Sequence, residues 1–321
     1  MSVITEIIGA HSLPELSNVC NSRELSFKGW LANKKFKVSN DIKANDFVLD
    51  IYDKDEIYIP YAFDINRMAT SSFESINGIA PDEKFPKSIG WLVVRLYYSA
   101  YYACHAILRI FGISCTQFNQ KESGIITEVA NVWGHAPDNS SASTGYFKCV
   151  LTNTANQMRC KKLDNSHADV WQCFYDHLDK LSDLISEDNS YLQSEKNKCV
   201  EYIFNLRFGL SCRGRYRKGN WLSKIRNEVN YQHTMGTWFP YSGSVAKHTD
   251  LYRALSNWNS ECIIDNLTHA KSENDLKLFV ESCVSIVSLC FSLTKDLHNQ
   301  NHDGFLKLGV FNFLNKANIR V

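Results

Sequence analysis

A continuous apolar stretch, residues 88–111, leaves few choices for how this chain folds. Its large side chains cover most of the circumference of a helix instead of one narrow stripe. They are Trp91, Val94, Leu96, Tyr98, Tyr101, Tyr102, Ala103, Ala106, Ile107 and Ile110. A helix that is apolar nearly all round is buried or lies at an interface, so we expect a central helix here. His105 lies on it and is interpreted either as a core histidine or as an auxiliary site residue.

Further helices are expected along the rest of the chain. Apolar residues recur at helical spacing in 168–184 and 192–208, and residues 249–270 and 274–300 read the same way. The sequence therefore predicts a mainly α-helical fold, with a helical domain at 81–321 that includes the C-terminal helices.

Residues 1–80 have a different pattern. Glu24–Trp30 and Asp46–Tyr52 alternate between apolar and polar residues, and Glu56–Pro60 resumes the alternation after a turn-like Asp-Lys-Asp. This pattern predicts short strands or a hairpin. We interpret residues 1–80 as a small β-containing N-terminal module or arm; irregular packing against the helical body is the alternative.

Composition narrows the class of protein. The 321 residues are 44% hydrophobic with a formal net charge of +1, which is typical of a soluble globular protein. Eleven cysteines without a C-x-x-C pair argue against a disulfide framework or a zinc knuckle, and favour reduced thiols in the cytoplasm. The N-terminus has no secretory-signal pattern, and the apolar tract 276–293 is too short and too polar to span a bilayer. We expect no membrane role.

Chemistry is concentrated in the stretch Leu222–His233, which the sequence predicts to be helical. Arg226 and His233 are seven residues apart, so on a helix they would face the same side, roughly 10 Å apart along the axis. Asn230 would lie between them, and Asn227 would point in another direction. One face of this helix would thus carry a cation, an amide and an imidazole.

The segment that leads into this helix is basic. Between Arg207 and Arg226 there is no acidic residue, although the whole chain is almost neutral. The residues expected to bind a nucleic-acid backbone are Arg213, Arg215, Arg217, Lys218 and Lys224. Such a local positive field can hold a polyanion such as RNA. The acidic residues between Asp176 and Asp188 would be a solvated face, or would dock the basic segment of a second copy.

Two features resemble one known family. Arg226-Asn227 followed by His233 is similar to the HEPN superfamily motif, in which an arginine and a polar residue precede a histidine. Leu96–Arg109 resembles the aromatic and alanine-rich core helix of HEPN domains. The resemblance covers mainly residues 88–240. It implies a HEPN-like helical bundle that acts as a homodimer, with a composite site at the symmetric interface. It also implies metal-independent endoribonuclease activity without a cofactor, in antiviral defence, abortive infection or as a toxin.

The chemistry of RNA cleavage suggests a role for each group. Imidazole titrates near neutral pH, so His233 is suited to proton transfer, while Arg226 binds phosphate oxygens and stabilises the charged transition state. Asn227 would orient the imidazole of a second copy or hold phosphate. Asn230, Tyr231 and Trp238 are auxiliary candidates. The aromatic residues that follow the helix would stack unpaired bases, or would instead form a hydrophobic plug.

The chain departs from the commonest family pattern in two ways. Its spacer of six residues is long for the family, and no His-x-Tyr follows the motif, which argues against control by an adenylyl-transferring antitoxin. The main alternative is a catalytically inactive HEPN-like RNA-binding or scaffold subunit of a defence or toxin–antitoxin complex. In either case the expected partners are RNA, with tRNA as one candidate, a second copy of the chain, and an antitoxin or regulatory protein. No metal site is expected, because His298 and His302 lack a third ligand.

Overall fold

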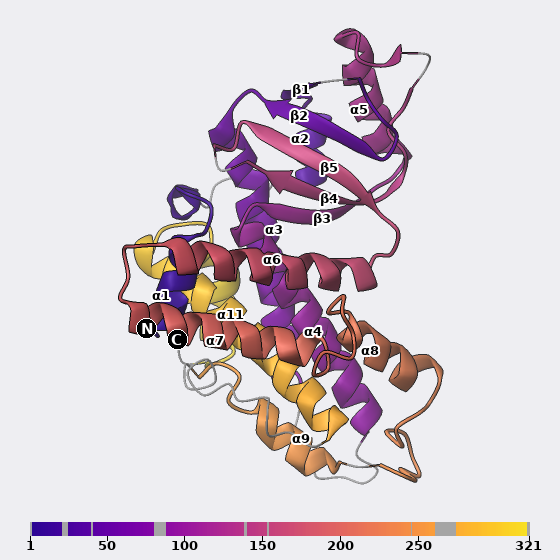
Figure 1. The fold of residues 1–321 in the computed structure, drawn as a ribbon, viewed down its shortest axis with the longest axis vertical. Coiled ribbons are helices and arrows are strands. Elements are labelled where there is room, and N and C mark those ends of the chain that lie inside the picture. The colour runs from indigo at the N-terminus through magenta and orange to yellow at the C-terminus, as the bar shows by residue number, and fades with distance from the viewer. Residues whose placement is uncertain are drawn as a thin grey trace.

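The computed structural model describes residues 2–20, 25–39, 41–79, 88–137, 140–152, 154–244, 246–260 and 274–319. Within these residues the protein is mainly helical with one small antiparallel sheet, in agreement with the predicted fold class (Figure 1). The sheet forms one end of the elongated molecule, and the long helices form the rest.

Three long helices make the centre of the helical part. They are α3 (Lys54–Asn77), α4 (Ile89–Ile110) and α11 (Asp275–Gln300), and α4 packs against both of the others. The Ser88 hydroxyl accepts a hydrogen bond from the Trp91 N–H and starts α4. Most of α4 is buried, so the prediction of a central buried helix at 88–111 is confirmed.

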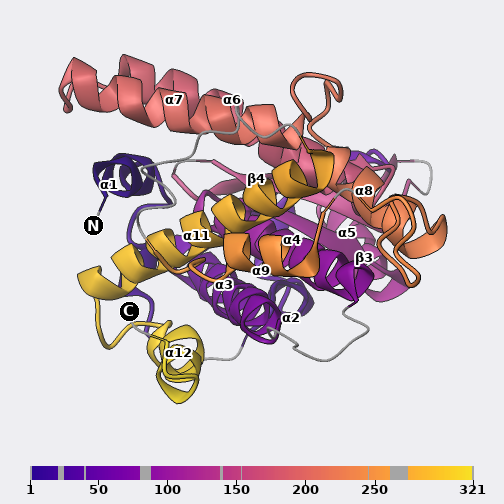
Figure 2. The ribbon, with the colours of Figure 1, turned by 90° about the horizontal axis from the view of Figure 1, so that it is seen from below.

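The remaining helices surround this centre. Helices α6 (Ala168–Glu187) and α7 (Gln193–Leu210) form an antiparallel pair, and α11 contacts both α7 and α3, as Figure 2 shows from below. The helices predicted at 168–184, 192–208 and 274–300 are therefore confirmed. Of the helix predicted at 249–270, the structure describes α9 (His248–Leu255); residues 261–270 lie outside the described ranges. The shorter helical elements are α1 (Val3–Ala10), η1 (Leu16–Asn18), α8 (Trp221–Tyr231), η4 (Lys307–Phe311) and α12 (Asn312–Lys316).

The sheet has five strands in the order β1-β2-β5-β4-β3, all antiparallel. They are β1 (Phe36–Val38), β2 (Asp46–Ile51), β3 (Ile113–Phe118), β4 (Gly145–Leu151) and β5 (Gln157–Leu163). Helices α2 (Phe27–Ala32) and α5 (Gln120–Val132) pack beside it, and Phe27 stacks on Phe118. The sheet joins strands from both sides of the expected boundary at residue 80.

The alternating segments near the N-terminus behave differently from one another. Asp46–Tyr52 forms β2 as predicted. The strand predictions for Glu24–Trp30 and Glu56–Pro60 are wrong. Residues 27–30 belong to α2, Glu24 lies outside the described residues, and Glu56–Pro60 lies in the first turns of α3. Asp53 accepts a hydrogen bond from the Asp55 N–H and caps α3, and a helix of 24 residues buries far more surface against α4 than a five-residue strand would.

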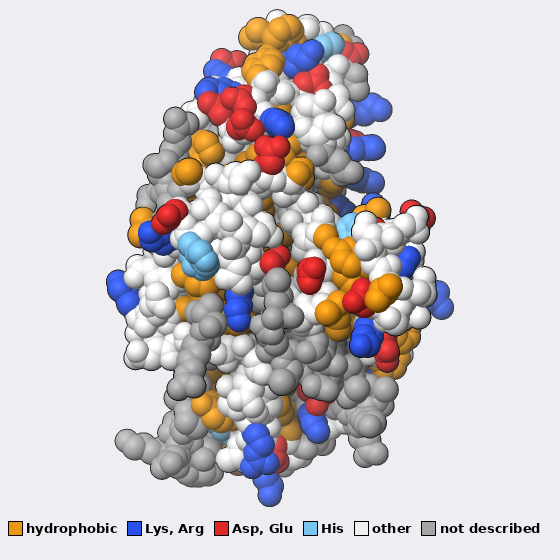
Figure 3. Space-filling model, turned by 90° about the vertical axis from the view of Figure 1, so that its left-hand side faces the viewer, with side chains coloured by type: hydrophobic (Ala, Val, Ile, Leu, Met, Phe, Trp, Pro, Cys, Tyr) orange, Lys and Arg blue, Asp and Glu red, His pale blue; other side chains and the backbone are white. Residues whose placement is uncertain are grey.

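By length and composition alone, α11 could cross a membrane. In the folded protein 89% of its apolar window is buried, as in the core helix of a globular protein. On the face drawn in Figure 3, acidic and basic side chains are interspersed, which matches the nearly neutral net charge.

Candidate functional site

Arg226 lies on α8, which packs against α4. Trp221, Leu222, Ile225 and Val229 bury the apolar side of α8, as helical spacing predicts. Arg226 is drawn into the same contact and is only 9% exposed. A guanidinium at this depth needs partners, because the loss of hydration is costly.

The partners of Arg226 are aromatic and amide groups. Its Nη2 donates to the hydroxyl of Tyr98 at 2.6 Å, and its Nη1 donates to Oδ1 of Asn227 at 2.7 Å. The guanidinium carbon lies 5.8, 5.5 and 5.2 Å from the ring centres of Tyr97, Tyr98 and Tyr231. These distances fit cation–π contacts, so tyrosines partly replace the lost water.

A carboxylate is missing from this set. Among the described residues, none of the Asp or Glu side chains lies within 4 Å of the Arg226 guanidinium, and its buried Nε has no hydrogen-bond partner there. Burial by itself lowers the pKa of Arg226, but the Tyr98 hydroxyl and the other tyrosines raise it above the ordinary value, so the group stays charged. A desolvated cation without a carboxylate partner among the described residues is suited to bind an anion.

A histidine that the sequence did not suggest contacts the same tyrosines as this arginine. His167 immediately precedes α6, and its Nδ1 is 3.0 Å from the hydroxyl of Tyr97. Trp171, one turn into α6, donates its indole N–H to the same hydroxyl at 3.1 Å. Burial and, after it, the charge of Arg226 lower the pKa of His167. In sequence, the Asn165 side chain that accepts from the His167 N–H is a helix-start signal, and nothing in the spacing links it to Arg226.

His233 does not lie on α8, so the prediction of one helix over 222–233 is wrong at its end. The helix ends at Tyr231, and His233 has a left-handed backbone with φ of 52°. The N–H and hydroxyl of Thr234 both donate to the Glu228 carbonyl, which ends the helical hydrogen bonding. The His233 side chain is exposed, and its ring centre is 5.9 Å from that of Trp238. The described chain shows no contact between His233 and Arg226.

Trp238 anchors the segment that follows His233. Its indole N–H donates to the Val229 carbonyl at 2.7 Å, and its ring meets Trp91 edge-on at 5.5 Å. A Cβ on Gly90 would lie 2.5 Å from the Trp238 ring, so glycine is required for this approach. These contacts agree with the hydrophobic-plug interpretation for Trp238, whereas Phe239 is largely exposed.

The basic segment is partly neutralised within the chain. Arg213 and Arg215 both pair with Asp275 at the start of α11, at 3.1 and 2.7 Å. Lys224 lies 3.8 Å from Glu228 and over the ring of Tyr216. Arg217 and Lys218 are exposed and form no ion pair with any residue in the described ranges. They are therefore the cations of this segment best placed to contact a polyanion.

The acidic residues of α6 and the side chain of Asn230 differ in their partners within the described residues. Arg207 pairs with Asp179 of the same chain, so this acidic position is already occupied. Asn230 is half-buried on α8, and the structure gives no hydrogen bond for its side chain within the described residues.

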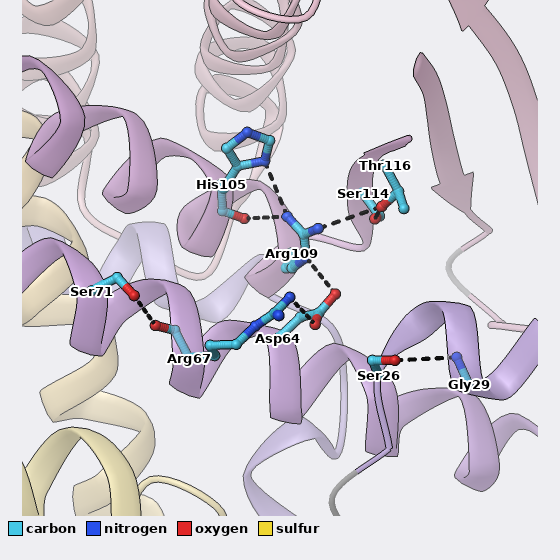
Figure 4. A network of polar contacts seen from close by, with 9 residues as sticks. All are labelled: Ser26, Gly29, Asp64, Arg67, Ser71, His105, Arg109, Ser114 and Thr116. Carbon is cyan, nitrogen blue, oxygen red and sulfur yellow. Dashed lines mark hydrogen bonds and ion pairs between the residues drawn. The ribbon is translucent and has the colours of Figure 1, made fainter. Parts of the chain in front are cut away.

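His105 belongs to a separate buried network, shown in Figure 4. It is 3.2 Å from Nη1 of Arg109, whose Nε donates to Asp64 at 3.3 Å. Burial, followed by the charge of Arg109, lowers the pKa of His105 well below its ordinary value. All three side chains are buried in the core between α3, α4 and β3. This environment is that of a core histidine.

Comparisons with protein-family models, with curated proteins and with solved structures gave no match. Within the described ranges, no group of three or more His, Cys, Asp or Glu side chains is arranged to hold a metal ion. The interpretation of the site therefore depends on its geometry and on the sequence resemblance.

Proposed function

We propose that the protein is a metal-independent endoribonuclease of the HEPN type. The observation that supports this most directly is Arg226, a buried cation that has hydroxyl and amide partners but no carboxylate partner among the described residues. A phosphodiester supplies the negative charge that such a guanidinium favours.

The proposed reaction needs no group beyond side chains and the RNA itself. The ribose 2′-oxygen attacks phosphorus as its proton is removed, and the 5′-oxygen leaves as it gains a proton. The products carry a 2′,3′-cyclic phosphate and a 5′-hydroxyl. Arg226 stabilises the charge on the phosphoryl oxygens, and His233 moves the protons. Arg217 and Lys218 contact flanking phosphates without reading sequence.

A homodimer completes the proposed site. His233 is exposed at the end of α8, so a second copy can bring its own His233 or Asn227 to the phosphate held by Arg226. The family resemblance is the reason for a symmetric dimer, and also for a role in antiviral defence, abortive infection or as a toxin in the cytoplasm. An antitoxin or regulatory protein as partner, and tRNA as a target, belong to the same proposal.

The test is cleavage of total RNA and purified tRNA in EDTA, with analysis of the fragment ends. We expect cleavage with 2′,3′-cyclic phosphate ends by the parent protein, and loss of it in Arg226→Ala and His233→Ala. Matched controls are Arg253→Ala and His302→Ala, which change exposed residues of α9 and of the turn after α11. Equal cleavage by the folded His233→Ala protein would refute the assigned role of His233.

The second candidate is an inactive RNA-binding or scaffold subunit. The observation in its favour is that His233 points into solvent without contacting Arg226 within the described chain. This candidate predicts that RNA is bound but left intact at all protein concentrations, including those at which the protein is fully dimeric. Binding would then depend on Arg226 and not on His233.

A further inference from the structure

We propose that His167 is a second anion-binding residue of the Arg226 site, where its Nε2–H donates a hydrogen bond to a phosphate oxygen held by the guanidinium. This inference deepens the proposed function and rests on it for the identity of the ligand, a phosphodiester of RNA. It gives a role to a residue far from the motif in sequence.

The two side chains share one pair of tyrosines. Arg226 donates to the Tyr98 hydroxyl at 2.6 Å and lies over the ring of Tyr97 at 5.8 Å. His167 has its Nδ1 3.0 Å from the Tyr97 hydroxyl, and its ring centre lies 6.3 Å from that of Tyr98. Helix α4 supplies both tyrosines, α8 supplies the arginine, and the histidine is the residue just before α6. The guanidinium and the imidazole are therefore neighbours across the same two rings.

The hydrogen bonds around Tyr97 favour one tautomer of His167. The Tyr97 hydroxyl has one hydrogen, and the indole N–H of Trp171 already donates to its oxygen at 3.1 Å. The hydroxyl hydrogen is therefore free to point at Nδ1 of His167, and we assign Nδ1 as its acceptor. In a neutral imidazole the remaining proton is then on Nε2. Within the described residues the hydrogen bond of the His167 ring is the one at Nδ1, and the side chain is half-buried, so the Nε2–H is available to a ligand.

The neutral state limits what His167 can do. Burial and the charge of Arg226 lower its pKa, so near neutral pH it has no proton to spare for a leaving oxygen. Giving up the Nε2 proton would create an imidazolate, which is far too basic to form here. His167 is thus suited to hold a phosphoryl oxygen as a neutral donor, while proton transfer remains with His233 in the proposed reaction.

The test compares His167→Gln, His167→Asn and His167→Ala. The amide nitrogen of glutamine reaches about as far as the imidazole Nε2, whereas the shorter asparagine amide corresponds to Nδ1. Two quantities are measured: kcat/KM for RNA cleavage, and the Kd for the same oligonucleotide with 2′-deoxy residues, which binds but is not cut. One hydrogen bond to a charged group is worth roughly ten- to hundredfold in affinity.

We expect His167→Ala and His167→Asn to lose roughly ten- to hundredfold in binding and cleavage, and His167→Gln to recover most of that loss. The pH profile of cleavage should have the same shape in His167→Gln as in the parent. If His167→Gln is as impaired as His167→Ala, or if it loses a limb of the pH profile, His167 is not a neutral donor. If all three variants match the parent, His167 lies outside the site.

These outcomes are separate from those of the proposed function. Loss of binding in His167→Ala, with recovery in His167→Gln, supports the inference even if the parent protein cuts no RNA. Failure of the parent to bind the oligonucleotide at all would overturn both proposals together.

Nitrogen-15 NMR of the histidine rings supplies a readout that is independent of RNA. We expect the His167 signal to be that of a neutral ring with its proton on Nε2, and Tyr97→Phe to abolish this fixed tautomer. Tyr102→Phe, on the same helix, is the matched control and should leave the signal unchanged. A His167 ring protonated on Nδ1 in the parent protein would overturn the inference.

Discussion

Replacement of Arg226 by methionine should hardly change the stability of the protein, although the residue is buried. The comparison is Arg109→Met, which removes the other deeply buried guanidinium described above. Arg109 pairs with Asp64, a carboxylate that is 3% exposed, so its removal leaves a buried charge whose remaining ionic partner among the described residues is the more exposed Arg67. Breaking a buried pair in this way costs about 3–5 kcal/mol of unfolding free energy.

Arg226 differs because, in the described part of the chain, its loss leaves no buried carboxylate without a partner. The change gives up the charged hydrogen bonds to Tyr98 and Asn227, each worth about 1.5–3 kcal/mol. Against this, it removes the desolvation penalty of the cation, which is also several kcal/mol, and places an apolar side chain among aromatic rings. The two effects oppose each other, and we expect a net change within about 1 kcal/mol.

Phosphate should stabilise the Arg109→Met and Arg226→Met proteins to different extents. If phosphate binds at Arg226 with a dissociation constant of about 1 mM, a hundredfold excess stabilises the folded state by about 2.7 kcal/mol. We expect this gain in the parent and in Arg109→Met, and its absence in Arg226→Met. The measurement is urea unfolding at neutral pH in phosphate and in chloride of equal ionic strength.

A loss of stability by Arg226→Met in chloride as large as that of Arg109→Met would contradict this prediction. Stabilisation of Arg226→Met by phosphate as strong as that of the parent protein would contradict it as well. Either result would make Arg226 a structural residue held by tyrosines, and would remove the main support for an anion site.

Three further predictions concern other parts of the molecule. Burial, helped by two nearby lysines, lowers the pKa of His177 from 6.5 to about 4, so the unfolded chain binds a proton at higher pH than the folded one. The free energy of unfolding should therefore fall by about 3 kcal/mol between pH 6.5 and pH 4. His177→Gln should lack this part of the pH dependence in urea unfolding measured across that range. Asp275→Asn removes a negative charge that pairs with Arg213 and Arg215 of the basic segment. RNA binding should therefore tighten and depend more steeply on salt, and an unchanged slope in salt titrations would contradict this. The methyl group of Gly90→Ala would collide with the Trp238 ring, which anchors the segment that carries His233. RNA cleavage should therefore drop roughly tenfold while the circular dichroism spectrum stays unchanged. Full activity would show that this segment tolerates displacement.

Local patterns predicted those elements whose stability is itself local or strongly periodic. The apolar circumference of 88–111 predicted α4, and the helical spacing of 168–184 predicted α6. Strands β3, β4 and β5 were not predicted from their short patterns, because a strand is stabilised by its partners, and β2 pairs with β5 across more than a hundred residues. The same lack of local information explains why Glu56–Pro60 resembled a strand. Its alternation is real, but packing of the whole of α3 against α4 decides its conformation.

The residues of the candidate site also differ in whether a local sequence pattern predicts them. Arg226 and Asn227 were predicted because they are adjacent in one motif on one helix. His167 reaches the same place because Trp171 and Tyr97 join α6 to α4, a contact that no spacing within either segment encodes. In the proposed anion site the tyrosine pair is the unit that joins the two cationic and polar groups, since Tyr97 orients the imidazole and Tyr98 holds the guanidinium. A chain that kept the arginine and histidine motif but lacked both hydroxyls would then retain the sequence signal and lose the geometry that binds phosphate.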